Sequence, residues 1–342
     1  MASAVSIAPE LISEERSLIQ RLSKVNGLRE VDSATHAIPW LSDLKILRRK
    51  VEYMESDPML RDAMTVNLGS SLLALDAVKV WLGRSKGKTE STTTNEQPAE
   101  LTESTPSSET SQKTSRKRKS EGQSSSLSKL PRQTRSKPAK DTASERDNGR
   151  CVITKMGKPV HICHIYRLSL GNETESARPI FWSLLQTFWD PETIASWKRD
   201  IMGLEGTEVT QNLLCLSTMM HDLWNSARLA FEPVDMSEDK KFLTMRFWWL
   251  PHRDYSPQVS LVVPPSLPSG PKASSGNAKL WNCDTDEPIY SGQLITIRTQ
   301  DPEAMPLPSF ALLKMQWFLN RIAAMSGAAD VTDEELEDYF GD

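Results

Sequence analysis

The sequence predicts an α+β protein with a helical region first, a long polar linker next, and mixed strands and helices after it. Three observations support this. Apolar residues recur every three or four positions in residues 8–84, which is typical of amphipathic helices. Residues 85–145 almost lack large apolar side chains. Eight of the ten tryptophans follow residue 146, among alternating apolar runs, and indicate a folded second half.

The N-terminal region, residues 1–84, is predicted to be a small helical hairpin or bundle. The apolar residues of 41–54 fall on one helical face, and the pattern resumes after Asp57-Pro58. Aspartate as a cap and proline at the first helical position predict that a helix starts there. An isolated amphipathic hairpin buries little surface, so we expect this region to dock on a partner protein or on the second half of the chain.

The linker, residues 85–145, is predicted to be disordered because it has too few apolar residues to offset the entropy of ordering. Residues 111–140 hold ten Lys or Arg and one Glu, a local charge of +9 in a chain of net charge −4. Four of the basic residues are consecutive, Arg116, Lys117, Arg118 and Lys119. This cluster is typical of a nuclear localisation signal or a nucleic-acid tether, and the alternative is a solvated spacer.

The cysteine content and the apolar runs indicate an intracellular protein. The four cysteines form no Cys-x-x-Cys pair, which argues against both a disulfide scaffold and a four-cysteine zinc knuckle. The first residues lack the basic start and apolar core of a secretory signal. No apolar run reaches the ~18 residues that a membrane span needs. With the basic cluster, we expect a nuclear protein that binds DNA and no membrane.

Residues 146–300 are predicted to form the second folded region. Two strand-like runs on either side of Met156-Gly157 predict a hairpin over residues 150–168. Helices are expected over 177–202, broken at Asp190-Pro191, and residues 212–227 are expected to form a turn followed by a helix. Further strands are expected at 228–236, 240–252, 257–263 and 294–299. In residues 301–342 we expect a helix that ends at Gly327, followed by an acidic tail.

Polar residues suited to catalysis gather in two segments. The strand-like run His161-Ile-Cys-His164 holds two of the five histidines and one of the four cysteines. Asn212 and His221 follow at the entry to a predicted helix and further along it. Histidine titrates near neutral pH and acts as a general base or a metal ligand, and asparagine suits a tight loop.

In this order and spacing, these segments resemble an HNH endonuclease domain with its ββα-metal finger, in the form found in many fungal proteins. The matching pieces are Cys151-x-x-Thr154, His164-Ile165, the Asn-Leu-x-x-Leu of Asn212 to Leu216, and the His-x-x-Trp-Asn of His221 to Asn225. The resemblance covers about residues 146–234. It implies a ββα-metal domain with a helical insertion and extra strands.

The resemblance implies an endonuclease that hydrolyses phosphodiester bonds of DNA with one divalent metal ion. His164 would be the general base, Asn212 would hold the loop, and His221 would bind the metal. Cys163 occupies the position of a second ligand. We expect Mg²⁺ or Mn²⁺, or Zn²⁺ because a thiolate is a soft ligand. Arg167 stands three residues after His164, where the family often has proline; it would either contact a phosphate or indicate relaxed selection on the site.

Two other functions are compatible with the same residues. One is a catalytically degenerate module of the same fold that binds nucleic acid or protein. The other is a zinc-stabilised interaction domain that uses Cys151, His161, Cys163 and Cys215.

Several residues have simpler structural interpretations. We expect His161 to be exposed to solvent, and Cys151 and Cys215 to be small core residues. Trp248-Trp249 is expected to be one core and one surface residue of a strand rather than a platform for stacking bases. The nuclease hypothesis further predicts that His164 and His221 converge on one small cavity, with Cys163 and Asn212 at its rim.

Overall fold

The computed structural model describes residues 13–69, 72–83, 135–171, 177–203, 206–265 and 277–329. These residues belong to one contact unit, made of Met1–Ser85 and Gln133–Asp342. Most of the predicted linker, including the cluster Arg116 to Lys119, and the acidic tail lie outside the described residues. No helix of the described residues is long and apolar enough to cross a membrane.

The N-terminal region is helical. Its elements are α1 (Ser13–Asn26), β1 (Glu30–Val31), α2 (Ser33–Leu41), α3 (Leu44–Ser56), α4 (Pro58–Gly69) and α5 (Leu72–Leu82). Aspartates cap several of these helices. The carboxylate of Asp57 accepts a hydrogen bond from the amide of Met59 at 2.8 Å, and α4 begins at Pro58, as predicted.

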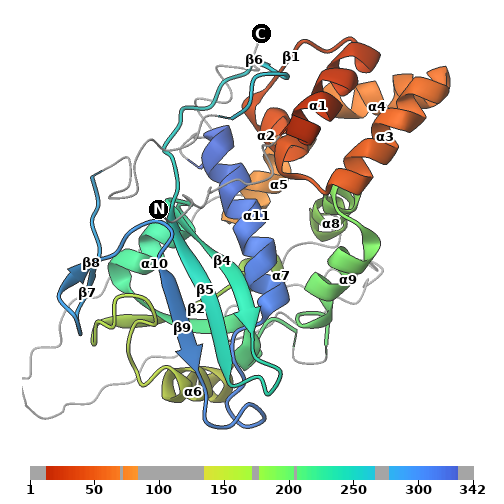
Figure 1. Ribbon diagram of the computed structural model, residues 1–342. Helices are drawn as coiled ribbons and strands as arrows, with labels where there is room; N and C mark the ends of the chain where they lie inside the picture. The colour runs from red at the N-terminus through yellow and green to blue at the C-terminus, as the bar shows by residue number, and fades with distance from the viewer. Residues whose placement is uncertain are drawn as a thin grey trace, which may run out of the picture. The chain divides into compact units, whose positions relative to one another are not determined.

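The N-terminal helices share a core with the second half of the chain. Helices α2 and α5 pack against α11 (Phe310–Ser326) (Figure 1). Helix α11 is the helix predicted for this part of the chain, and it ends just before Gly327, whose φ is 71°. The indole Nε1 of Trp81 on α5 donates to Oδ1 of Asn320 on α11 at 2.8 Å, and both side chains are buried. This contact shows where the N-terminal helices dock within the chain.

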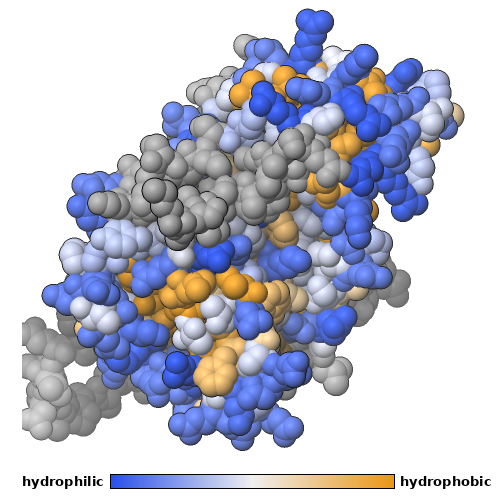
Figure 2. All heavy atoms as spheres, viewed as in Figure 1, coloured by the Kyte–Doolittle hydropathy of each residue, from blue (hydrophilic) through white to orange (hydrophobic). Residues whose placement is uncertain are grey.

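A three-stranded antiparallel sheet lies beside α11 (Figure 1). Its strands are β4 (Leu229–Met236), β5 (Phe242–Trp249) and β9 (Leu294–Arg298), in the order β4-β5-β9. Trp248 stacks on Trp317 of α11 with ring centroids 6.2 Å apart, and Trp249 is fully buried. Both tryptophans are therefore core residues, which corrects the expectation that one of them lies at the surface. Apolar side chains also gather on the surface over this sheet (Figure 2), and Phe242 and Leu294 are exposed there.

Most of the predicted strands in this half are present, and one is much shorter than expected. Within residues 257–263 only β6 (Val259–Ser260) forms, and it pairs with β1 of the N-terminal region. The remaining elements are α7 (Leu168–Gly171), α8 (Ala177–Phe188), α9 (Pro191–Arg199), a 3₁₀ turn at Thr210–Asn212, β7 (Trp281–Asn282) and β8 (Glu287–Pro288). Helix α9 starts at Pro191 with Asp190 as its cap, as predicted.

The end of the predicted disordered linker is helical, which corrects its boundary at residue 145. Helix α6 (Lys137–Arg146) is capped by Ser136 and packs against strand β3 (Leu213–Ser217). The side chain of Arg146 is fully buried, pairs with Asp147 at 2.8 Å and donates to the carbonyl of Leu213 at 2.7 Å. Composition alone does not reveal these tertiary contacts, which order an otherwise polar segment.

The predicted hairpin over residues 150–168 is wrong. Strand β2 (Val160–His164) pairs antiparallel with β3, from Val160 opposite Ser217 to His164 opposite Leu213. Helix α10 (Thr218–Asn225) follows β3 directly. The expected partner strand is instead a turn, because the amide of Lys155 donates to the carbonyl of Cys151 at 3.0 Å. The candidate site is therefore built on β2, β3 and α10.

Candidate active site

Strand β2 presents its two histidines to opposite sides. Side chains alternate along a strand, so His161 and Cys163 share one face while His164 points to the other. Helix α10 packs on β2 and contacts the His161 side through His221. His164, at the end of the strand, instead meets the segment that precedes the 3₁₀ turn.

His164 is held by a carboxylate that the sequence analysis did not identify. Its Nε2 lies 2.5 Å from Oε1 of Glu208, and the two side chains are only 9% and 6% exposed. The other oxygen of Glu208 accepts a hydrogen bond from the amide of Ser136 at 2.5 Å, just before α6. Burial lowers the pKa of His164, while the contact with Glu208 opposes this shift. The lowered pKa favours the neutral imidazole, which is the form that accepts a proton.

Asn212 connects the two segments that carry this pair. It is completely buried. Its Oδ1 accepts from the amide of Tyr166 at 2.7 Å, and its Nδ2 donates to the carbonyls of Tyr166 and Thr207, each at 2.8 Å. Tyr166 follows His164 by two residues and Thr207 precedes Glu208 directly. Asn212 thus fixes the position of His164 relative to Glu208.

His221 on α10 contacts the other histidine of β2. Its Nδ1 lies 3.2 Å from Nδ1 of His161, with the rings nearly perpendicular at 83°. Its Nε2 lies 2.9 Å from the side-chain amide of Asn225, one turn further along α10. Burial lowers the pKa of His221, and the neighbouring His161 lowers it further. As expected, His161 is exposed to solvent.

Cys163 does not fit the ligand position that the resemblance assigned to it. The residue is 2% exposed, its Sγ lies 3.4 Å from the carbonyl oxygen of His161, and burial raises the pKa of the thiol. Only a thiolate binds metal well. Cys151 and Cys215 are core residues as expected, and burial raises the pKa of Cys215 to about 12.

The zinc-stabilised domain finds no support in the described ranges. Within them, no group of three or more His, Cys, Asp and Glu side chains is placed to hold a metal ion. The donors that do fit a metal ion, in chemistry and separation, are the facing imidazole nitrogens of His161 and His221.

The side chain of Arg167 donates hydrogen bonds to backbone carbonyls of two helices. Its guanidinium donates to the carbonyl of Leu82 at the end of α5 at 2.6 Å, and to the carbonyl of Asn225 at the end of α10 at 2.8 Å. These bonds tie the N-terminal helices to the helix that carries His221. A contact between Arg167 and a phosphate stays a prediction.

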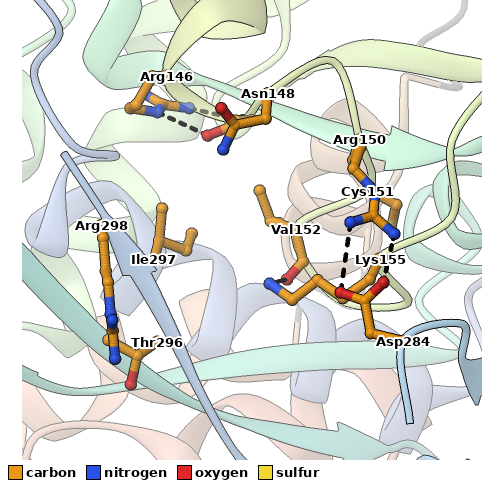
Figure 3. A pocket seen from close by; sticks show the side chains of 11 residues that line it. Arg146, Asn148, Arg150, Cys151, Val152, Lys155, Asp284, Thr296, Ile297 and Arg298 are labelled. Carbon is orange, nitrogen blue, oxygen red and sulfur yellow. Dashed lines mark hydrogen bonds and ion pairs between the residues drawn. The ribbon is translucent and has the colours of Figure 1, made fainter.

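The expected placement of Cys163 and Asn212 at the rim of a cavity is wrong, since both are buried in the core. His164 and His221 also take separate partners, Glu208 and His161. A cavity of about 490 Å³ lies elsewhere, and Arg146, Arg150, Lys155 and Arg298 are among the residues that line it (Figure 3). His164, His221, Asn212 and Cys163 are not among the residues that line this cavity, whereas Cys151 is.

Comparison with known proteins supports the resemblance. Residues 151–232 match the family model described as HNH endonuclease. This range includes the His161–His221 pair, the His164–Glu208 pair and Asn212. No curated protein and no solved structure matches the chain. Residues 151–232 are therefore similar to an HNH endonuclease domain.

Proposed function

We propose that the protein is a metal-dependent HNH endonuclease that hydrolyses phosphodiester bonds of DNA. The observation that carries this proposal is the contact between His164 and Glu208 inside the segment that matches the nuclease family. A general base must be positioned precisely and must be unprotonated at working pH. The bonds of Asn212 and the lowered pKa of His164 meet these two requirements.

In the proposed reaction His164 takes a proton from water. Glu208 occupies Nε2, which leaves Nδ1 as the acceptor. The resulting hydroxide attacks phosphorus, and the bond to the leaving sugar oxygen breaks. Glu208 stabilises the imidazolium that forms, as a carboxylate does behind a catalytic histidine. A divalent ion, when bound, offsets the charge that develops on the phosphate and the leaving oxygen.

The basic segment is the proposed source of non-specific DNA affinity and of nuclear import. Residues 113–132 contain seven Lys or Arg, among them Arg116 to Lys119, and one Glu. Lysine and arginine release counterions from DNA without reading its sequence. Deletion of residues 113–132 should weaken duplex binding and flatten its salt dependence. Unchanged affinity would leave the segment as a spacer or an import address.

A second candidate, a degenerate module that binds nucleic acid or protein without cutting, is favoured by one observation. The position before the base carries a buried thiol rather than an accessible metal ligand. If no other residue takes the place of this metal ligand, the protein would still bind its partner but would not hydrolyse phosphodiester bonds.

Plasmid nicking separates the two candidates. Purified full-length protein is incubated with supercoiled DNA and Mg²⁺, Mn²⁺ or Zn²⁺, each against an EDTA control. We expect conversion to nicked circles with at least one ion, and none with EDTA. Retardation of the DNA without nicking under every ion would refute the nuclease and support the degenerate module.

A further inference from the structure

We propose that His161 and His221 together bind one divalent transition-metal ion through their Nδ1 atoms, and that His161 replaces Cys163 as the ligand from strand β2. This inference deepens the proposed function by naming the ligands of its metal. His161 was expected to be exposed to solvent, and it was a metal ligand only in the alternative zinc-stabilised domain. The structure brings it to the helix that carries the second histidine.

The separation of the two nitrogens fits a shared ion. Nδ1 of His161 and Nδ1 of His221 are 3.2 Å apart. Two nitrogens bound at about 2.0–2.1 Å to one Zn²⁺ lie about 3.3 Å apart at a tetrahedral angle, and about 2.9 Å apart at a right angle. The observed distance lies between these values. It also fits a single proton shared by the two rings, so the measurement must separate a metal from a proton.

The rest of His221 is arranged as metal-bound histidines usually are. A metal-binding imidazole typically gives its other N–H to an acceptor that fixes its orientation. The side-chain amide of Asn225 lies 2.9 Å from Nε2 of His221. Because the oxygen and nitrogen of an amide are assigned from their partners, a half-turn of this group places Oδ1 at the same point as an acceptor. The Nε2–H of His221 then donates to Oδ1 of Asn225, and the lone pair on Nδ1 of His221 faces His161.

The position and chemistry of the pair indicate the kind of ion and its use. Imidazole nitrogens suit Zn²⁺, Co²⁺ or Ni²⁺ better than Mg²⁺, which prefers oxygen. His161 is exposed, so an ion between the two rings is accessible from solvent. Two protein ligands are one fewer than catalytic zinc sites usually have, and they leave the other coordination positions to water or a phosphate oxygen.

Cobalt titration tests the ligand set independently of DNA cleavage. Full-length protein freed of metal is titrated with Co²⁺, and the visible ligand-field absorption is recorded with the near-ultraviolet region where thiolate–cobalt bands appear. We expect one Co²⁺ per chain and no thiolate band. His161→Ala and His221→Ala should each weaken binding by more than the about 10- to 100-fold that loss of an outer-shell partner costs.

Two matched variants control for other donors. Cys163→Ser removes the alternative ligand from the same strand, and His252→Ala removes a histidine that does not match the nuclease motif. Both should bind Co²⁺ like the wild type. Absence of Co²⁺ binding, unchanged binding by His161→Ala, or a thiolate band that Cys163→Ser removes would overturn the proposal. Binding as expected in a protein that never nicks DNA would refute the proposed nuclease and leave this site standing.

Discussion

Replacement of Asn212 by alanine should destabilise the protein strongly, because this side chain joins two segments from inside the core. The change removes three hydrogen bonds and leaves the amide of Tyr166 and the carbonyls of Tyr166 and Thr207 without their side-chain partner. A buried polar group left unsatisfied costs about 1–3 kcal/mol. Partial relaxation reduces the sum, so we expect the free energy of unfolding to fall by about 3–5 kcal/mol.

Urea denaturation followed by tryptophan fluorescence measures this loss. Asn282→Ala is the matched control, because its side chain accepts one exposed hydrogen bond from the amide of Asp284 at 2.9 Å. The control should lose less than about 1 kcal/mol. If Asn212→Ala also loses less than about 1 kcal/mol, its three bonds do not hold the segments of His164 and Glu208 together, and the reasoning fails.

Three further predictions follow from buried groups. Arg146→Met leaves Asp147 as an unpaired buried charge, so the free energy of unfolding should fall by about 3–5 kcal/mol in the same denaturation assay. A fall of less than about 0.5 kcal/mol would contradict the buried pair. In native protein a thiol reagent should quickly label the exposed Cys283 alone, because the other three cysteines are buried; a second fast thiol would disprove this packing. Glu208→Gln removes a group that raises the pKa of His164, so the acidic limb of the pH–rate profile for nicking should move to lower pH, and a move to higher pH would contradict the pairing.

Helix boundaries were predictable where the residues that set them are local. Asp57-Pro58 and Asp190-Pro191 start helices in the structure, and Gly327 ends one. A capping carboxylate, a fixed proline φ and a glycine at positive φ act within a few residues of the boundary. The sequence alone therefore contains the information that these predictions need.

The pairing of strand β2 was not predictable from local pattern. Every residue of β3, Leu213–Ser217, is buried, so the strand lacks the alternation that marks a half-exposed strand. The turn from Cys151 to Lys155 imitates a strand in composition while its backbone bonds close locally and to Cys215. Contacts between distant parts of the chain therefore determine both the pairing of β2 with β3 and the turn from Cys151 to Lys155.

The candidate site was predicted in part. His164, Asn212 and His221 were identified from their order in the chain. Glu208 was missed because it lies 44 residues from His164 and carries no local signal. The partners of His161 and Cys163 depend on which residues α10 covers, since both side chains share one face of β2. The alternation of residues along a strand predicts which side chains share a face, but it does not predict which helix packs against that face.

The most direct test of the central claim compares plasmid nicking by wild-type protein, His164→Ala and His252→Ala under the same divalent ion. Tryptophan fluorescence and Co²⁺ titration first establish that all three are folded and bind metal alike. The account predicts that the wild type and His252→Ala nick equally, and that His164→Ala nicks about 10²- to 10⁴-fold more slowly, as expected for loss of a general base. Nicking by His164→Ala at the wild-type rate would contradict it.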